Sequence, residues 1–132
     1  NLMAAIGRVQ LRKFDLMTAQ RRRLSVRYRK QLSCLEHVEF FNYNLREVVP
    51  HIYPIRVING KRDDLKKYLS DHKVQTGVHY KPNHLHKMFG NDMRLPNSEK
   101  LWGEVISLPL HPDLSEEQQG FVVQKISEFF AS

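Results

Sequence analysis

The sequence opens on a long stretch of helical periodicity, residues 1–35, NLMAAIGRVQLRKFDLMTAQRRRLSVRYRKQLSCL. Its apolar residues recur at steps of three, four, seven or eight, which is the spacing of one face of an α-helix. They are Leu2, Ile6, Val9, Leu16, Met17, Leu24, Tyr28, Leu32 and Leu35. Lys13 and Gln20 interrupt this stripe, so the pattern allows a bend. A continuous helix of roughly 34 residues is about 50 Å long, whereas a compact chain of this size has a diameter of roughly 36 Å. We therefore expect the amino-terminal half of the helix to pack on another domain or subunit.

The start of the chain agrees with this expectation. The apolar periodicity begins directly after Asn1, with no lead-in and no initiator methionine. Asn1 can also serve as a helix N-cap. We expect the chain to be a piece of a longer protein.

The rest of the chain alternates short strand and helix patterns. Pro54 lies inside the second strand pattern, which predicts an edge or bulged strand there. Trp102 follows Leu101 at helical spacing to Val105, and we expect it in the core. The predicted elements are strands at 38–41, 51–58 and 74–80, a turn at Asn59-Gly60, helices at 63–72 and from Asn97 or Ser98 to about Val105, an extended segment at 108–110, and a helix opened by the S-x-x-Q capping box at 115–118. The order predicts one α+β domain over residues 1–132, with a small, largely antiparallel sheet covered by helices.

Composition limits the classes of partner. The formal charge of +7 and the pI near 9.7 are compatible with nucleic acid, an anionic membrane or a phosphorylated small substrate. The basic run Arg21–Arg23, with Arg27, Arg29 and Lys30, winds around the helix without interleaved aromatic residues, so it predicts a solvated face or an interdomain seam rather than nucleic-acid binding. No apolar run approaches 18 residues, and Cys34 is the only cysteine. We expect no membrane span and a reducing, cytoplasmic setting.

The densest polar cluster is residues 77–86, GVHYKPNHLH. His79, His84 and His86 are chemically able to ligate a metal, but their spacing matches no common zinc motif and no cysteine or carboxylate lies in the segment. Imidazole, phenol, ammonium and amide groups donate hydrogen bonds to phosphates and sugar hydroxyls. The segment therefore predicts an anion- and hydroxyl-binding loop, with a ligand-free surface loop as the alternative. His111 is left open between a core role and the edge of a site.

Three segments, in order and spacing, resemble the carboxy-terminal third of the nucleotide-sugar aminotransferases. This is the DegT/DnrJ/StrS-type branch of the aspartate aminotransferase superfamily, fold type I. NLMAAIGRVQL at 1–11 resembles the helix after the family's cofactor-phosphate asparagine motif. VQTGVHYKPNHLH at 74–86 resembles its T-G-x-H-Y-x-P-x-H loop, and ISLPLHPDL at 106–114, followed by Ser115-Glu116-Glu117, resembles its S-L-P-x-x-P-x-L-(S/T)-x-E-E segment.

The resemblance implies that the chain is the carboxy-terminal small domain of an enzyme that uses pyridoxal phosphate (PLP) to transfer an amino group, usually from glutamate, to a keto carbon of a nucleotide-linked sugar. Such enzymes serve amino-sugar and surface-polysaccharide biosynthesis. The lysine and other cofactor ligands are expected in an amino-terminal large domain, so no residue here is assigned to catalysis, cofactor binding or metal binding. His79 and Tyr80, with His84 and the neighbouring Lys81, are the expected substrate-binding residues, close to the interface of a homodimer. The sugar, its nucleotide and the keto carbon stay open.

Other functions also stay open. The chain is alternatively a stand-alone module that binds sugar nucleotides or a protein partner. A family member that lost its lysine and became an isomerase, a dehydratase or a regulator is another alternative. A basic nucleic-acid binder is the third.

Overall fold

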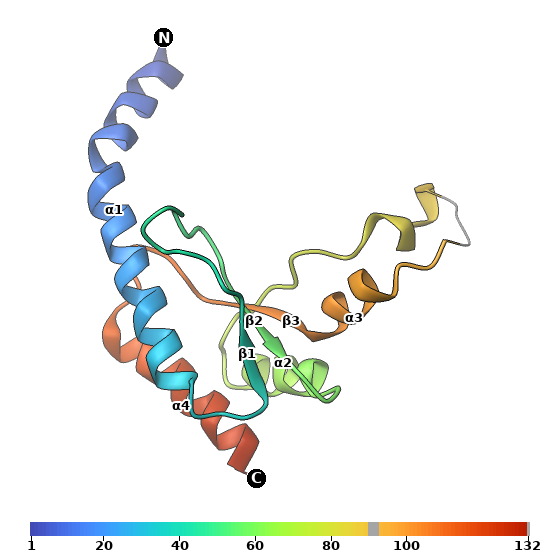
Figure 1. The fold of residues 1–132 in the computed structure, drawn as a ribbon. Helices are drawn as coiled ribbons and strands as arrows, with labels where there is room; N and C mark the ends of the chain where they lie inside the picture. The colour runs from blue at the N-terminus through green and yellow to red at the C-terminus, as the bar shows by residue number, and fades with distance from the viewer. Residues whose placement is uncertain (90–92, 132) are drawn as a thin grey trace.

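The computed structural model describes residues 1–89 and 93–131. Four α-helices, two short 3-10 helices and three strands follow one another in the described chain (Figure 1). In order, they are α1 (Leu2–Leu32), β1 (Val38–Phe40), β2 (Tyr53–Val57), α2 (Arg62–Asp71), η1 (Asn83–Leu85), η2 (Lys87–Phe89), α3 (Pro96–Glu104), β3 (Val105–Leu108) and α4 (Glu116–Ala131). The α+β class, the long first helix and the small antiparallel sheet are confirmed. Within the described residues, none of the helices has both the length and the apolar character that a membrane span requires.

The three strands form an antiparallel sheet in the order β1-β2-β3, so β2 is its central strand. The prediction that Pro54 marks an edge strand is therefore wrong. Pairing with β1 ends at Phe40 opposite Ile55, one residue before the proline. Pro54 lies opposite Ser107 of β3, and Ser107 directs its own backbone bonds away from β2, toward Gly77. The missing N–H of Pro54 thus points to the side where β1 has already ended, and no ladder bond is lost there.

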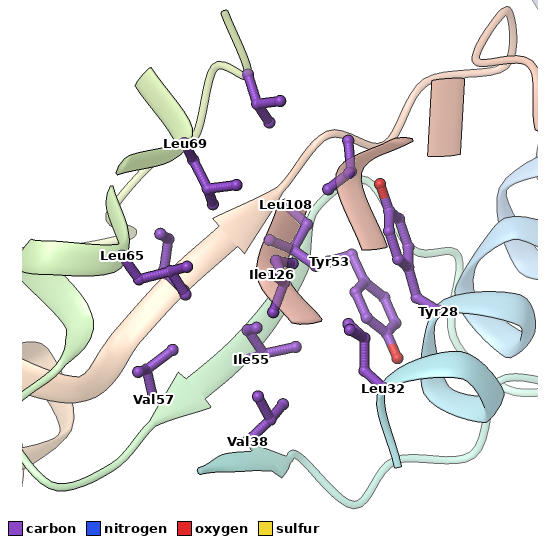
Figure 2. Packing of buried hydrophobic residues seen from close by; sticks show 13 residues of the cluster. Tyr28, Leu32, Val38, Tyr53, Ile55, Val57, Leu65, Leu69, Leu108 and Ile126 are labelled. Atoms are coloured by element: carbon purple, nitrogen blue, oxygen red, sulfur yellow. The ribbon is translucent and has the colours of Figure 1, made fainter. Parts of the chain in front are cut away.

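One face of the sheet, here called the inner face, carries the hydrophobic core against α1, α2 and α4 (Figure 2). The side chains of β2 alternate, with Tyr53, Ile55 and Val57 buried on this face. Tyr28 of α1 stacks on Tyr53 with ring centroids 5.1 Å apart, and its hydroxyl donates to the carbonyl of Pro109 at 3.1 Å. Burial raises the pKa of both tyrosines, so both stay protonated over the ordinary pH range. The remaining buried members of the cluster are Leu32, Val38, Leu65, Leu69, Val74, Ile106, Leu108, Val122 and Ile126.

The opposite, outer face of the sheet is polar at its centre. Arg56 of β2 donates to Glu39 of β1 at 2.6 Å and, through two nitrogens, to Glu104 at the end of α3 at 2.5 and 2.9 Å. The hydrogen bond to Glu104 is the largest cause of a raised pKa for Arg56. The side chain of Glu104 is only 12% exposed, and both Arg56 nitrogens donate to its Oε2, so this ion pair holds the end of α3 against the sheet.

The long helix α1 is only half covered. It spans 31 residues, about 46 Å, without interruption. All of residues 1–16 are exposed, and the first buried side chain is Thr18. The apolar side chains in the uncovered half are Leu2, Met3, Ile6, Val9, Leu11, Phe14 and Leu16. Figure 1 shows this half projecting beyond the other elements. Residues 1–89 and 93–131 therefore supply no cover for the first half of the helix.

The basic run of α1 contacts the rest of the chain. Arg22 donates to the carbonyls of Val48 and Arg46 at 3.2 and 3.1 Å, which ties the loop between β1 and β2 to the helix. Arg23 and Arg27 both pair with Glu116 at the start of α4. This part of the run therefore makes contacts within the domain, which neither of the two predicted readings describes, and an interdomain seam stays a prediction.

Several predicted boundaries change in the structure. The last helix begins as expected at a capping box. Ser115 Oγ accepts from the Gln118 N–H at 3.1 Å, and Gln118 Oε1 accepts from the Ser115 N–H at 2.9 Å. Helix α3, by contrast, begins at Pro96. The side chain of Glu99 caps its amino-terminal end by accepting a hydrogen bond from the N–H of Leu95. The strand that follows lies at Val105–Leu108 rather than at 108–110, because its pairing with β2 ends at Leu108 opposite Tyr53.

Candidate substrate-binding site

The segment that carries the predicted site meets the sheet at the edge formed by β3. Gly77 and Ser107 exchange two backbone hydrogen bonds, of 3.1 and 2.7 Å, as an isolated antiparallel bridge. The prediction of a full strand over 74–80 is therefore wrong, since only this bridge forms. The chain leaves the sheet after Gly77 because the side chain of His79 occupies the space beside it.

His79 is held from two sides. Its Nδ1 shares a 2.9 Å hydrogen bond with the hydroxyl of Ser107, and the Tyr80 ring meets the imidazole edge-on, with centroids 4.8 Å apart and an interplanar angle of 83°. The imidazole folds back over Gly77, where an added Cβ would lie 2.4 Å from its Cε1. A side chain at position 77 would therefore require the imidazole of His79 to move. With Nδ1 engaged by Ser107, Nε2 is the ring nitrogen left to face a ligand.

His79 and Tyr80 line a cavity of about 410 Å³ on the outer face. Its walls come from the loop 79–82, from α3 and the start of β3, and from the segments on either side of the β1–β2 loop. The lining residues are Phe41, Ile52, Pro54, His79, Tyr80, Pro82, Ser98, Leu101, Trp102 and Val105. A cavity of this size with mostly apolar walls and a few polar groups is typical of small-molecule sites.

Lys81 lies at this cavity without lining it. Its ammonium nitrogen is 5.8 Å from the centre of the Trp102 ring, within cation–π range. Trp102 is half-buried, so the expectation that it belongs to the core is wrong, although Val105 of the same predicted helical face is buried. The indole lies at the cavity because α3 covers the outer face and contributes none of its side chains to the core.

His84 occupies a different place. Its side chain is 7% exposed, and Nε2 pairs with Glu99 Oε1 at 3.0 Å. The hydrogen bonds from Leu95 and His84 lower the pKa of Glu99. His84 lines a second cavity, of about 390 Å³, on which Pro82 and Ser98 also border. The pair thus ties the loop after Pro82 to the first turn of α3. Whether any of His79, Tyr80, Lys81 and His84 binds substrate stays a prediction.

The other histidines stand apart from this cavity. His86 and His111 are exposed, and both use their carbonyls in turns, toward Phe89 and Leu114. Within residues 1–89 and 93–131, no three His, Cys, Asp or Glu side chains gather as a metal site would need.

Sequence reasoning missed much of the cavity wall. Phe41, Ile52 and Pro54 come from segments distant in sequence from the 77–86 loop, and Ser107 gave no polar signal in its apolar strand. One signal was present for Glu99. A glutamate three residues after Pro96, at the start of a helical pattern, is placed to reach back to the first backbone N–H groups.

The fold and this site define a small α+β domain with a mostly apolar cavity on the outer face of its antiparallel sheet. The model of the DegT/DnrJ/EryC1/StrS aminotransferase family matches residues 1–127, and the chain belongs to this family. The Pleiotropic regulatory protein of Geobacillus stearothermophilus is 37% identical over 98% of the chain and 36% of its own length. The dTDP-3-amino-3,6-dideoxy-alpha-D-galactopyranose transaminase of Aneurinibacillus thermoaerophilus is 30% identical over 97% of the chain and 36% of its own length.

Solved structures agree with the family. Spr1654 of Streptococcus pneumoniae, solved in a PLP form, superposes with a TM-score of 0.89 at 25% identity, over 98% of the chain and 35% of that protein. The chain thus spans about a third of the length of the relatives it matches.

PLP requires particular side chains around it. In PLP enzymes a lysine forms the covalent bond to the cofactor and an acidic or basic side chain contacts the pyridine nitrogen. The walls of the His79 cavity include neither a lysine nor a carboxylate, and Lys81 stands over Trp102 instead. The residues of this cavity do not fit PLP by themselves.

Proposed function

We propose that this chain is the carboxy-terminal small domain of a PLP-dependent aminotransferase that transfers an amino group from glutamate to a keto nucleotide sugar. The observation that carries the proposal is the match of the aminotransferase family model over residues 1–127, together with a transaminase of a dTDP-linked amino sugar at 30% identity. The chain alone is proposed to be catalytically incomplete, because its candidate cavity contains no group that would hold the cofactor.

The proposed contribution of this domain is substrate binding. His79 would donate from or accept at Nε2, Tyr80 would offer its exposed hydroxyl, and Lys81 would supply positive charge. Tyr80 is 74% exposed, so its hydroxyl is accessible to a ligand. His84 would act by holding the loop through Glu99 rather than by reaching the cavity in which His79 lies. His79, Tyr80 and Lys81 would orient substrate, His84 would position their loop, and none of the four would take part in bond breaking.

The uncovered half of α1 is a surface on which an amino-terminal large domain could pack. Seven apolar side chains between Leu2 and Leu16 are exposed, in a helix about 46 Å long. We propose that the amino-terminal large domain and the second subunit of a homodimer cover this half. Leu11→Arg in the whole protein should lower the dimer fraction measured by light scattering, while leaving the unfolding of the isolated chain unchanged. A dimer that is unaffected by this change at Leu11 would contradict the placement.

The test of the function uses the whole protein from which the chain comes. Purified with PLP, it should be yellow and should form 2-oxoglutarate from glutamate when given a keto nucleotide sugar. The His79→Ala variant should raise the KM for the nucleotide sugar about tenfold, which corresponds to about 1.4 kcal/mol of lost binding. The KM for glutamate should stay unchanged. A whole protein that binds no PLP, or that binds it and transfers no amino group, would overturn the proposal.

One observation favours a second candidate. The relative at 37% identity is named as a pleiotropic regulatory protein rather than as an enzyme. A family member that had lost the lysine would bind the sugar nucleotide and act as a regulator or in another reaction. Nucleotide-sugar binding without amino transfer in the whole protein would favour this candidate. The cytoplasmic setting remains a prediction that rests on the single cysteine.

A further inference from the structure

The cavity beside His79 is lined mostly by apolar side chains. Phe41, Ile52 and Pro54 form one wall, and Leu101 and Trp102 of α3 form another. Such surfaces favour stacking and van der Waals contact with a planar ring. A sugar needs a hydrogen-bond partner for each buried hydroxyl, and among the described residues the polar side chains that line the cavity are only His79, Tyr80 and Ser98.

A positive charge stands beside these walls. Lys81 has its ammonium 5.8 Å from the Trp102 ring centre. The carboxylates of the same region already have partners, since Glu99 pairs with His84 and Glu104 with Arg56. No ion pair of Lys81 with a carboxylate forms among residues 1–89 and 93–131. The net charge of +7 adds a field that attracts anions.

We infer that this cavity takes the base of a nucleoside diphosphate, with Trp102 as a stacking surface and Lys81 as the group that binds the diphosphate. The inference rests on the proposed function, in which the substrate is a nucleotide-linked sugar, and it assigns the base end of that substrate to named residues. The volume of about 410 Å³ lies within the range of small-ligand sites. A phosphate binds an ammonium more strongly than an aromatic ring does at an exposed site, so the contact between Lys81 and Trp102 can be exchanged for one with ligand.

Helix α3, which carries Trp102, is held at both of its ends. Arg56 binds Glu104 at the carboxy-terminal end of the helix. Glu99 caps the amino-terminal end by accepting from the N–H of Leu95, and it also pairs with His84. Trp102 is therefore fixed between two anchored ends rather than carried on a free loop. A pre-positioned aromatic side chain loses little conformational entropy when a ring stacks on it.

The experiment uses the fact that Trp102 is the only tryptophan of the chain. Its fluorescence and its single indole N–H signal in NMR both report on the cavity. UDP, dTDP and GDP at millimolar concentration should each be tested, with inorganic pyrophosphate and free glucose as separate arms. At least one nucleoside diphosphate should quench the fluorescence and shift the indole signal, while pyrophosphate alone should bind more weakly and glucose should have no effect. No indole response to any of the three nucleotides, or a response to pyrophosphate equal to theirs, would overturn the inference.

Variants locate the response. Affinity measured by calorimetry should fall about tenfold or more in Trp102→Ala, which is within the range for loss of one base-stacking side chain. Trp102→Phe should recover most of it, and Lys81→Gln should weaken nucleotide binding and reduce its salt dependence. Matched controls are Phe121→Ala and Lys73→Gln, since both residues line a separate cavity of about 540 Å³. Controls that weaken binding as much as Trp102→Ala would place the nucleotide elsewhere.

The same variant separates this inference from the proposed function. In the whole protein, Trp102→Ala should raise the KM for the nucleotide sugar with little change in kcat. If amino transfer is present and this KM does not move, the base site is wrong while the proposed function stands. If amino transfer is absent from the unaltered protein, the proposed function fails, and the indole titration still decides the base site.

Discussion

Replacing Gly77 by alanine is the sharpest single perturbation of the site. The added Cβ would lie 2.4 Å from Cε1 of His79 and 3.2 Å from both ring nitrogens, whereas ordinary contact begins at 3.4 Å. The imidazole must therefore move by about 1 Å. Because His79 Nδ1 now lies 2.9 Å from Ser107 Oγ, such a movement breaks this hydrogen bond unless the serine follows.

The magnitude follows from two opposing effects. Ser107 is 4% exposed, so its hydroxyl would lose its partner away from water, at a cost of about 1–3 kcal/mol. Alanine also restricts the unfolded chain, which stabilises the folded state by about 0.4–1 kcal/mol. We expect Gly77→Ala to lower the free energy of unfolding by about 1 kcal/mol, which corresponds to a Tm lower by roughly 4 °C for a chain of this size.

Thermal unfolding followed by circular dichroism measures the stability change, and NMR of the His79 ring reports its position. The matched control is Gly103→Ala in α3, where no heavy atom lies within 4 Å of the added Cβ. This control should raise the free energy of unfolding by up to about 1 kcal/mol, because alanine favours helix over glycine. An alanine at position 77 that leaves both the Tm and the His79 ring signals unchanged would refute the close approach on which the site depends.

Three further predictions concern the core, the pair of His84 with Glu99, and the last helix. Ile126→Ala should lower the free energy of unfolding by about 2–5 kcal/mol, because Ile126 is fully buried. Leu16→Ala, at a side chain 77% exposed, should change the free energy of unfolding by less than about 0.5 kcal/mol in the isolated chain. If urea unfolding shows that both variants lose the same free energy of unfolding, the described core is contradicted. Glu99→Gln should be less stable than the unaltered chain above about pH 4.5, because the hydrogen bonds from Leu95 and His84 lower the pKa of Glu99, and this stabilisation is lost as the pH falls through the lowered pKa. If the urea midpoints of the Glu99→Gln variant and the unaltered chain differ by the same amount above pH 4.5 and below the lowered pKa, this cause is contradicted. Ser115→Ala should cost about 1 kcal/mol by removing the cap of α4, and an unchanged Tm would show that the capping box contributes nothing.

The elements with strong local signals were predictable. The apolar periodicity of residues 1–35 predicted α1, and the serine and glutamine at 115 and 118 marked the start of α4. Asn59 and Gly60 adopt φ values of 63° and 71°, as the Asn-Gly turn signal predicts. In each case, residues close in the chain provide the deciding interactions.

The elements that depend on distant partners were misjudged. Pro54 lies in the central strand because β1 ends one residue short of it, and strand length is decided by pairing. The 74–80 segment forms a single bridge because His79 turns back over Gly77. Trp102 faces a cavity because Arg56 holds α3 on the outer face of the sheet, and no local pattern distinguishes that face from the core.

By itself, the sequence determined which segments are helical, where the last helix begins, and that the 77–86 loop concentrates hydrogen-bond donors. These properties are set by side chains within a few residues of one another, where backbone geometry fixes the spacing. Only the tertiary structure decided that His79 joins Phe41, Pro54 and Trp102 around one cavity while His84 turns to Glu99. Contacts between segments far apart in the chain depend on how the sheet and helices pack, and that packing is a property of the whole fold.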